Sequence, residues 1–176
     1  MAATMERREA TEFRVSGRRL EGYAATFGNP AKIGSFTEVI EPGAFRTSLL
    51  SGRDILALAD HDPSKVLART RSKTLTLSED GKGLTFSLDV PDTQAGQDVL
   101  ALAQRGDLGG MSFGFTATDE VWPSKDKRVL RSVQLFEISV VSAWPAYEGT
   151  VVHARSHVPV ITPRLRLARL YMETTR

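Results

Sequence analysis

The feature that most constrains the fold is an alternation of apolar and polar residues near the middle of the chain. Every second position from 84 to 90 is apolar, in the order Leu84, Phe86, Leu88 and Val90. Successive side chains of a strand point to opposite faces of a sheet, so this period of two predicts a strand with one buried face. Residues 79–83 before it contain two glycines and follow an extended segment, residues 74–77, which together predict a β-hairpin.

Most of the other regular segments are also expected to be strands. Gly17 divides residues 11–27 into two extended segments, and Phe13 and Val15 alternate on the first of them. Further strands are predicted over residues 36–40, 55–61, 112–121 and 129–142. The chain is therefore expected to be rich in β-structure.

Two helices are predicted among these strands. Residues 41–43 lead into a short helix that reaches Leu50. A longer helix begins after Asp92 or Thr93, either of which caps its start, and Gly106 ends it. The apolar stripe of this helix consists of Val99, Leu100, Leu102 and Ala103. Together with the strands, these helices predict a single α+β, β-rich domain.

Composition narrows the class of protein. A chain of 176 residues with 41% hydrophobic and 25% charged residues fits one soluble domain with a real core. The absence of cysteine excludes disulfides, thiolate catalysis and cysteine-bound zinc. A net charge of +2, spread along the chain, argues against a dedicated nucleic-acid binder. No apolar run reaches the length of a membrane span and the start lacks the apolar core of a signal peptide, so we expect a cytoplasmic protein or part of an assembly built there.

The chain is expected to divide into three parts. Residues 1–10 are predicted to be a flexible N-terminus, residues 11–158 a folded domain, and residues 159–176 a basic tail or short helix. In the tail, arginines and leucines follow one another after Pro163. Such a tail could contact nucleic acid as an accessory, but not as the main activity.

Ser112 is the first candidate for a chemical role. It lies between Gly110 and Gly114, on the strand face opposite Met111 and Phe113. Glycines let other backbone come close, and the amides of this segment are candidate oxyanion donors. The spacing matches a G-x-S-x-G elbow, but the residues that follow are strand-like, so the α/β-hydrolase fold is rejected. An ordinary serine in a β-turn is the alternative.

His61 is the candidate base. If it continued the strand over residues 55–61, it would share a face with Ile55, Ala57 and Ala59. Asp60 and Asp62 would then point to the opposite face and could not orient the imidazole. A carboxylate must come from elsewhere, unless His61 is only a structural histidine.

Glu137 is the candidate carboxylate. It interrupts an apolar strand on the predicted face of Val133, Leu135, Ser139 and Val141. A buried carboxylate is unfavourable unless a partner compensates it, and a histidine partner would be held in one tautomer. A glutamate that faces solvent on a one-sided strand is the alternative.

Several short motifs in order resemble the prohead (capsid maturation) proteases of tailed bacteriophages, relatives of the herpesvirus capsid assembly protease. The resemblance spans roughly residues 20–155 and is carried by Gly22-Tyr23-Ala24 with Phe27, Glu41-Pro42-Gly43-Ala44-Phe45, His61-Asp62-Pro63, Gly83-Leu84, Met111-Ser112-Phe113-Gly114-Phe115, Glu137-Ile138-Ser139-Val140-Val141, Pro145-Ala146-Tyr147, and Thr150 with Arg155. The chain departs from the family at Asp60, where asparagine is common, and at Ala68, where glycine is usual.

The resemblance implies a herpesvirus-protease-like fold, with a mainly antiparallel sheet or closed β-barrel and a few helices. It implies a serine endopeptidase with His61 as base, Ser112 as nucleophile and a third member on the following strand. Herpesvirus relatives use a second histidine there, whereas Glu137 stands at the corresponding strand of this chain. His153 and His157 come after that strand.

The resemblance also implies the biology. Such proteases need no cofactor, lie inside the immature capsid in the host bacterial cytoplasm, and cleave scaffolding segments, parts of the major capsid protein and finally themselves. Arg155 could assist at the oxyanion, or be an ordinary surface arginine. A homodimer is left open, because the herpesvirus relatives are activated by dimerising. A non-catalytic scaffold or capsid-binding module of the same fold is the alternative function.

A metal-dependent hydrolase is a second rival. His61, His153 and His157 would be its ligands, and the last two have a spacing that fits one face of a helix. Pro159 and the neighbouring valines disfavour that helix, and no acidic ligand pattern accompanies it.

Overall fold

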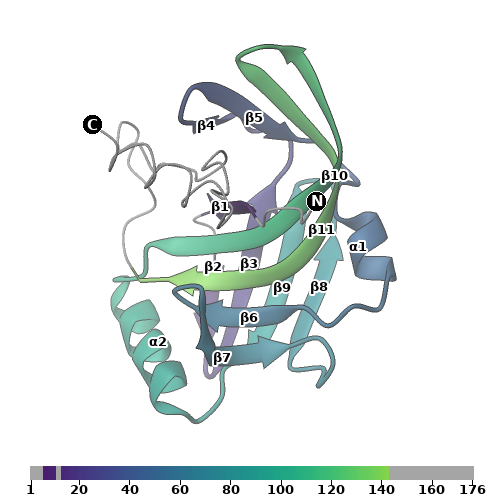
Figure 1. Ribbon diagram of the computed structural model, residues 1–176. Coiled ribbons are helices and arrows are strands. Elements are labelled where there is room, and N and C mark those ends of the chain that lie inside the picture. The colour runs from purple at the N-terminus through teal and green to yellow at the C-terminus, as the bar shows by residue number, and fades with distance from the viewer. Residues whose placement is uncertain (1–5, 11–12, 143–176) are drawn as a thin grey trace, which may run out of the picture.

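The computed structural model describes residues 6–10 and 13–142, and it is built from two sheets with two helices at their margins (Figure 1). The strands are β1 Glu6–Ala10, β2 Phe13–Ser16, β3 Arg19–Thr26, β4 Ala31–Ile33, β5 Phe36–Ile40, β6 Leu56–Ala59, β7 Asp62–Arg69, β8 Leu75–Glu79, β9 Gly83–Asp89, β10 Gly110–Ser124 and β11 Lys127–Val141. The helices are α1 Arg46–Leu50 and α2 Gln94–Arg105. The expectation of a β-rich single domain with few helices is confirmed, with open sheets rather than a closed barrel.

The smaller sheet contains the hairpin that the alternating pattern predicted. Its strand order is β2-β3-β9-β8, and every neighbouring pair is antiparallel. The turn between β8 and β9 is closed by Asp80, whose carboxylate accepts hydrogen bonds from the backbone N–H groups of Lys82 and Gly83. The alternating residues of β9 face the core, which confirms that a period of two marked a half-buried strand.

The larger sheet is organised around the hairpin of β10 and β11. Its main path is β1-β10-β11-β5-β4, and β6 and β7 extend it from another part of β11. One edge of β11 serves two parallel partners in turn, β5 near its start and β6 near its end. Between these two partners, α1 and the residues before it accept the hydrogen bonds of β11. Val133 N–H donates to Ala44 O at 2.9 Å, and Leu135 N–H donates to Ser48 Oγ at 2.8 Å. The edge of β11 is thus continuously bonded along the half that carries the site.

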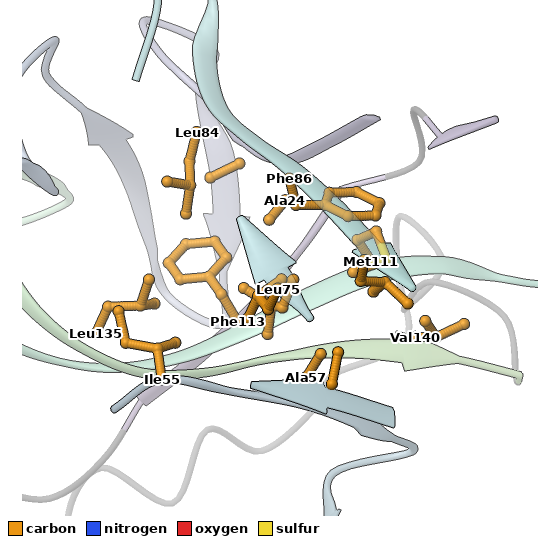
Figure 2. Close-up of a cluster of buried hydrophobic side chains, with 14 of the residues drawn as sticks. Ala24, Ile55, Ala57, Leu75, Leu84, Phe86, Met111, Phe113, Leu135 and Val140 are labelled. Atoms are coloured by element: carbon orange, nitrogen blue, oxygen red, sulfur yellow. The ribbon is translucent and has the colours of Figure 1, made fainter. Parts of the chain in front are cut away.

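The hydrophobic core lies between the two sheets. Leu84 and Phe86 of the small sheet face Met111, Phe113 and Val140 of the large one (Figure 2). The aromatic rings of Phe113 and Phe115 stack with centroids 5.2 Å apart, and Phe45 meets Phe113 edge-on at 5.5 Å. This packing fixes the inner face of β10, and therefore the direction in which its alternate residues point.

Both predicted helices are present. The hydroxyl of Thr93 accepts from Gly96 N–H at the start of α2, and Gly106 ends this helix in the left-handed region with φ 75°. Neither α1 nor α2, the helices in the described part of the chain, is long and apolar enough to cross a membrane.

Three strands were not expected from the sequence. Residues 6–10 were assigned to a flexible N-terminus, but they form β1 along the open edge of β10, where unpaired backbone groups accept a further strand. β4 is a three-residue edge strand. β7 begins with Asp62 and Pro63, a polar start that gave no strand signal. The predicted tail, residues 159–176, lies outside the described residues.

Candidate active site

The register of β10 and β11 brings four residues of the candidate site together on one face of the large sheet. Ser112 lies opposite Ser139, and Gly114 lies opposite Glu137. The neighbouring residues Met111, Phe113 and Ile138 belong to the core, so Ser112, Gly114, Glu137 and Ser139 point away from it. Ser112 and Glu137 therefore lie on the same outer face of this hairpin.

A bulge in β11 places Glu137 on the face opposite to the predicted one. The pairing shifts between Gly114 and Phe115, because Phe115 lies opposite Leu135 whereas Gly114 lies opposite Glu137. Phe136 is the extra residue of this β-bulge, and it reverses the alternation. Leu135 consequently faces the core. Glu137 faces the other way, although the simple period of two predicted that both would share a face. The bulge therefore turns the carboxylate of Glu137 away from the core that Val133 and Leu135 of the same strand face.

His61 reaches the site from a turn rather than from a strand face, which corrects a second expectation. β6 ends at Ala59, and Ala59 pairs with Asp62 across a two-residue turn. Asp60 and His61 form this turn with φ of 50° and 59°. Such left-handed angles at both central positions match the twist of a tight hairpin, and Asp and His are among the residues that tolerate them.

The imidazole of His61 contacts the carboxylate of Glu137. The Nδ1 atom of His61 is 2.8 Å from Oε1 of Glu137, and the side chains are 20% and 5% exposed. A carboxylate accepts hydrogen bonds, so Nδ1 is the nitrogen that donates, and Nε2 is left with the lone pair of the neutral ring. This is the tautomer in which a histidine acts as a general base through Nε2.

Two neighbours fit around the Glu137 carboxylate. Ser139 Oγ donates to Oε2 at 2.5 Å, and Ser139 is fully buried. On the other side, a Cβ atom at Gly114 would be 2.5 Å from Oε1 of Glu137, closer than real Cβ atoms come to other atoms. Gly114 thus provides the space in which the carboxylate lies across β10.

The acids beside His61 have other partners. The carboxylate of Asp60 accepts from the backbone N–H of Ser142 at 2.7 Å and from its hydroxyl at 3.0 Å. The hydroxyl and backbone N–H of Ser64 bind Asp62 and hold the pKa of that carboxyl below its usual value. The Asp60 bonds join the turn that carries His61 to the end of β11, and Glu137 is the carboxylate that contacts the imidazole.

Ser112 lies at the buried end of this arrangement. Its side chain is 0% exposed, and its Oγ has no hydrogen-bond partner among the residues that the structure describes. Buried hydroxyl groups are nearly always paired, so an unpaired one calls for an explanation, and a catalytic role is one such explanation. The hydroxyl is not committed to a structural hydrogen bond within the described chain.

Other predicted groups are placed differently or lie outside the description. The backbone N–H of Gly109, the residue before the segment considered for an oxyanion site, donates to Val141 O at 2.8 Å. Arg155, His153 and His157 lie outside the described residues. Within residues 6–10 and 13–142, no group of three or more His, Asp or Glu side chains is arranged to hold a metal ion.

Comparison with known proteins identifies the family. Residues 4–160 match the family model described as caudovirus prohead serine protease. The chain belongs to this family. The bacteriophage T4 capsid assembly protease gp21 has a similar structure, with a TM-score of 0.57 at 9% sequence identity, over 79% of this chain and 97% of that one. No curated protein matches the sequence.

The family match confirms the resemblance that the ordered motifs indicated, and the T4 protein confirms the fold. Sequence reasoning had missed the contacts of Gly114 and Ser139 with Glu137. One signal was present for Ser139: it follows Glu137 by two positions in a strand, so the two side chains share a face. The role of Gly114 depends on the pairing of β10 with β11, which the sequence does not display.

Proposed function

We propose that this chain is the serine endopeptidase of phage capsid maturation. It acts inside the assembling prohead in the host bacterial cytoplasm, where it cleaves scaffolding segments, parts of the major capsid protein and itself. The observation that carries the proposal is the 2.8 Å contact of His61 with the buried Glu137, on the sheet face that also carries Ser112. Membership of the prohead protease family supports it.

The three residues have the roles that a hydroxyl nucleophile needs. Ser112 Oγ attacks the peptide carbonyl carbon while His61 Nε2 takes the hydroxyl proton, and the carbonyl bond opens to give an oxyanion. Glu137 holds the imidazole through Nδ1 and stabilises the positive charge that forms on it. The same imidazole then gives its proton to the leaving amine as the peptide bond breaks. Water repeats the cycle on the acyl-serine and releases the second product.

The burial of Ser112 adds a condition to this chemistry. With its side chain 0% exposed, the hydroxyl cannot meet a peptide carbonyl from solvent. We infer that substrate reaches Ser112 only in a state that exposes this side chain. The His61–Glu137 contact is already present while Ser112 is buried.

Co-expression with the cognate capsid protein tests the proposal. The native chain should shorten both the capsid protein and itself, and Ser112→Ala should abolish both cleavages while leaving capsid binding intact. Ser35→Ala is the matched control, because Ser35 is an exposed serine in the turn between β4 and β5. Full cleavage by Ser112→Ala would exclude the serine mechanism. Binding by the native chain without any cleavage would instead indicate a non-catalytic assembly module.

A further inference from the structure

Ser139 forms a hydrogen bond with the second carboxylate oxygen of Glu137. Its hydroxyl donates to Oε2 of Glu137 at 2.5 Å, while Oε1 of the same carboxylate is 2.8 Å from His61 Nδ1. We propose that Ser139 is a positioning residue that fixes the rotation of the Glu137 carboxylate and thereby the imidazole of His61. This inference rests on the proposed Ser112–His61–Glu137 triad and adds a fourth residue to it.

Strand geometry explains why Ser139 can hold this position. Ser139 follows Glu137 by two residues in β11, so both side chains leave the same face of the sheet. The bulge at Phe136 lies before this pair, and the register from Glu137 to Val141 is regular. Because Ser139 is also 0% exposed, water does not compete for its hydroxyl. The contact is therefore built into the strand rather than made by a mobile surface group.

Ser112 and Ser139 lie opposite each other on β10 and β11, but their hydroxyl groups differ in hydrogen bonding. The Ser139 hydroxyl donates a hydrogen bond to the carboxylate, whereas the Ser112 hydroxyl has no partner among the described residues. A nucleophile must be able to pass its proton to the imidazole, and the proton of Ser139 is directed to Glu137 instead. Hydrogen bonds therefore link Ser139 to Glu137 and Glu137 to His61. The Ser112 hydroxyl takes no part in them and stays available as the nucleophile.

The carboxylate needs this second hydrogen bond because it is buried. The Glu137 side chain is 5% exposed, and a buried anion is stable only where hydrogen bonds replace water. A hydroxyl that donates to a carboxylate forms one of the stronger hydrogen bonds in proteins. Without it, the carboxylate would turn away from Nδ1 and stabilise the imidazolium less. The hydroxyl of Ser139 is directed to Glu137 rather than to substrate, so its loss should affect turnover more than substrate binding.

The test compares Ser139→Ala with Ser139→Thr in the full chain. With a capsid-protein substrate, Ser139→Ala should lower kcat by about 10- to 100-fold with little change in KM. Ser139→Thr keeps the hydroxyl and should recover most of the loss. The proton NMR resonance of His61 Nδ1–H, shifted far downfield by its carboxylate partner, should move or disappear in Ser139→Ala and remain in Ser139→Thr. Ser112→Ala is the control, since it should lose activity and keep that resonance.

Unchanged kcat and an unchanged Nδ1–H resonance in Ser139→Ala would overturn the role of Ser139. A structural defect alone would also contradict it: the resonance would then stay in place while activity fell in proportion to the folded fraction. Failure of the triad itself is distinguishable, because Ser112→Ala would then cleave as fast as the native chain. The NMR comparison of the two Ser139 variants needs no turnover and would still report whether Ser139 positions Glu137.

Discussion

At the scale of single residues, the candidate site depends on whether one buried carboxylate reaches one imidazole. Glu137 lies across the neighbouring strand, in the space left where Gly114 has no side chain. Gly114 has an ordinary strand backbone, so glycine is needed there for room rather than for an unusual φ. A methyl group at that position would compete directly with the contact to His61.

Gly114→Ala should therefore disable the site. The added Cβ would lie 2.5 Å from Oε1 and 3.0 Å from Cδ of Glu137, so the carboxylate must move. We expect cleavage of the capsid protein to fall at least about tenfold, with a loss of about 1–3 kcal/mol in the free energy of unfolding. Gly81→Ala is the matched control, because nothing lies within 4 Å of a Cβ there. Equal activity of both variants in a cleavage assay would contradict the packing described.

Glu137→Gln tests the charge of the same side chain. An amide keeps the shape of the carboxylate but carries no negative charge to stabilise the imidazolium. We expect kcat to fall by more than about tenfold, equivalent to about 1.4 kcal/mol. His61→Ala should lose as much activity as Ser112→Ala, because triad members act as a unit. A smaller effect of Glu137→Gln, measured by single-turnover cleavage, would assign the third role to another residue.

The sequence indicated candidate residues for the site but not the contacts around them. His61, Ser112 and Glu137 stood out because a histidine, a glycine-flanked serine and a lone carboxylate are unusual in apolar segments. The face of Glu137 was predicted wrongly, because a bulge at Phe136 changes the alternation and leaves no composition signal. The contact of Ser139 with Glu137 depends on side-chain direction as well as sequence position.

At the scale of elements, the hairpin of β6 and β7 carries His61, the proposed base. β6 runs beside the end of β11 (Figure 1) and pairs with it in parallel at Glu137 and Ser139. The turn after β6 brings His61 Nδ1 to 2.8 Å from Oε1 of Glu137. The sequence predicted β6 but extended it through His61, because the left-handed turn at residues 60 and 61 contains no glycine. β7 was missed because its first half is polar and contains proline.

Asp60 should control the position of this turn. Its carboxylate accepts two hydrogen bonds from Ser142, and its φ of 50° suits Asp or Asn better than Ala. Asp60→Ala should lower the free energy of unfolding by about 1–2 kcal/mol and reduce kcat as His61 loses its fixed position. Asp60→Asn keeps the tolerance for this φ and one acceptor oxygen, so it should be much milder. Urea unfolding and cleavage rates compare the two, and equal losses would contradict the role of the turn.

At the scale of the whole molecule, a buried cation joins distant parts of the larger sheet. Arg128 of β11 binds carboxylates from three other strands, Glu6 of β1, Glu38 of β5 and Glu120 of β10. Burial opposes its charge, but the hydrogen bonds with Glu6 and Glu120 outweigh that effect and raise the pKa of the guanidinium above its usual value. The contact with Glu6 also fastens β1 to the sheet, which explains why residues 6–10 form a strand in a segment expected to be flexible.

Replacing Arg128 should destabilise the whole fold. Its side chain is 7% exposed and that of Glu38 is 1% exposed, so Arg128→Met would leave a buried carboxylate without its guanidinium. Breaking a buried ion pair of this kind costs about 3–5 kcal/mol of unfolding free energy. Arg19→Met is the control, because the pair of Arg19 with Asp89 is about half exposed and should matter little. Urea unfolding near neutral pH measures the stability of both variants. A loss of unfolding free energy no larger than that of the control would contradict the stabilising role of the Arg128 ion pairs.

In the proposed mechanism, Ser112 is the nucleophile and His61 activates it. To test this, the native chain is treated with a fluorophosphonate under conditions in which it cleaves the capsid protein. Peptide mapping by mass spectrometry then identifies the labelled residue. We expect one adduct, on Ser112, that is absent from His61→Ala and still forms in Ser35→Ala. An adduct on another serine, or equal labelling of Ser112 when His61 is alanine, would contradict it.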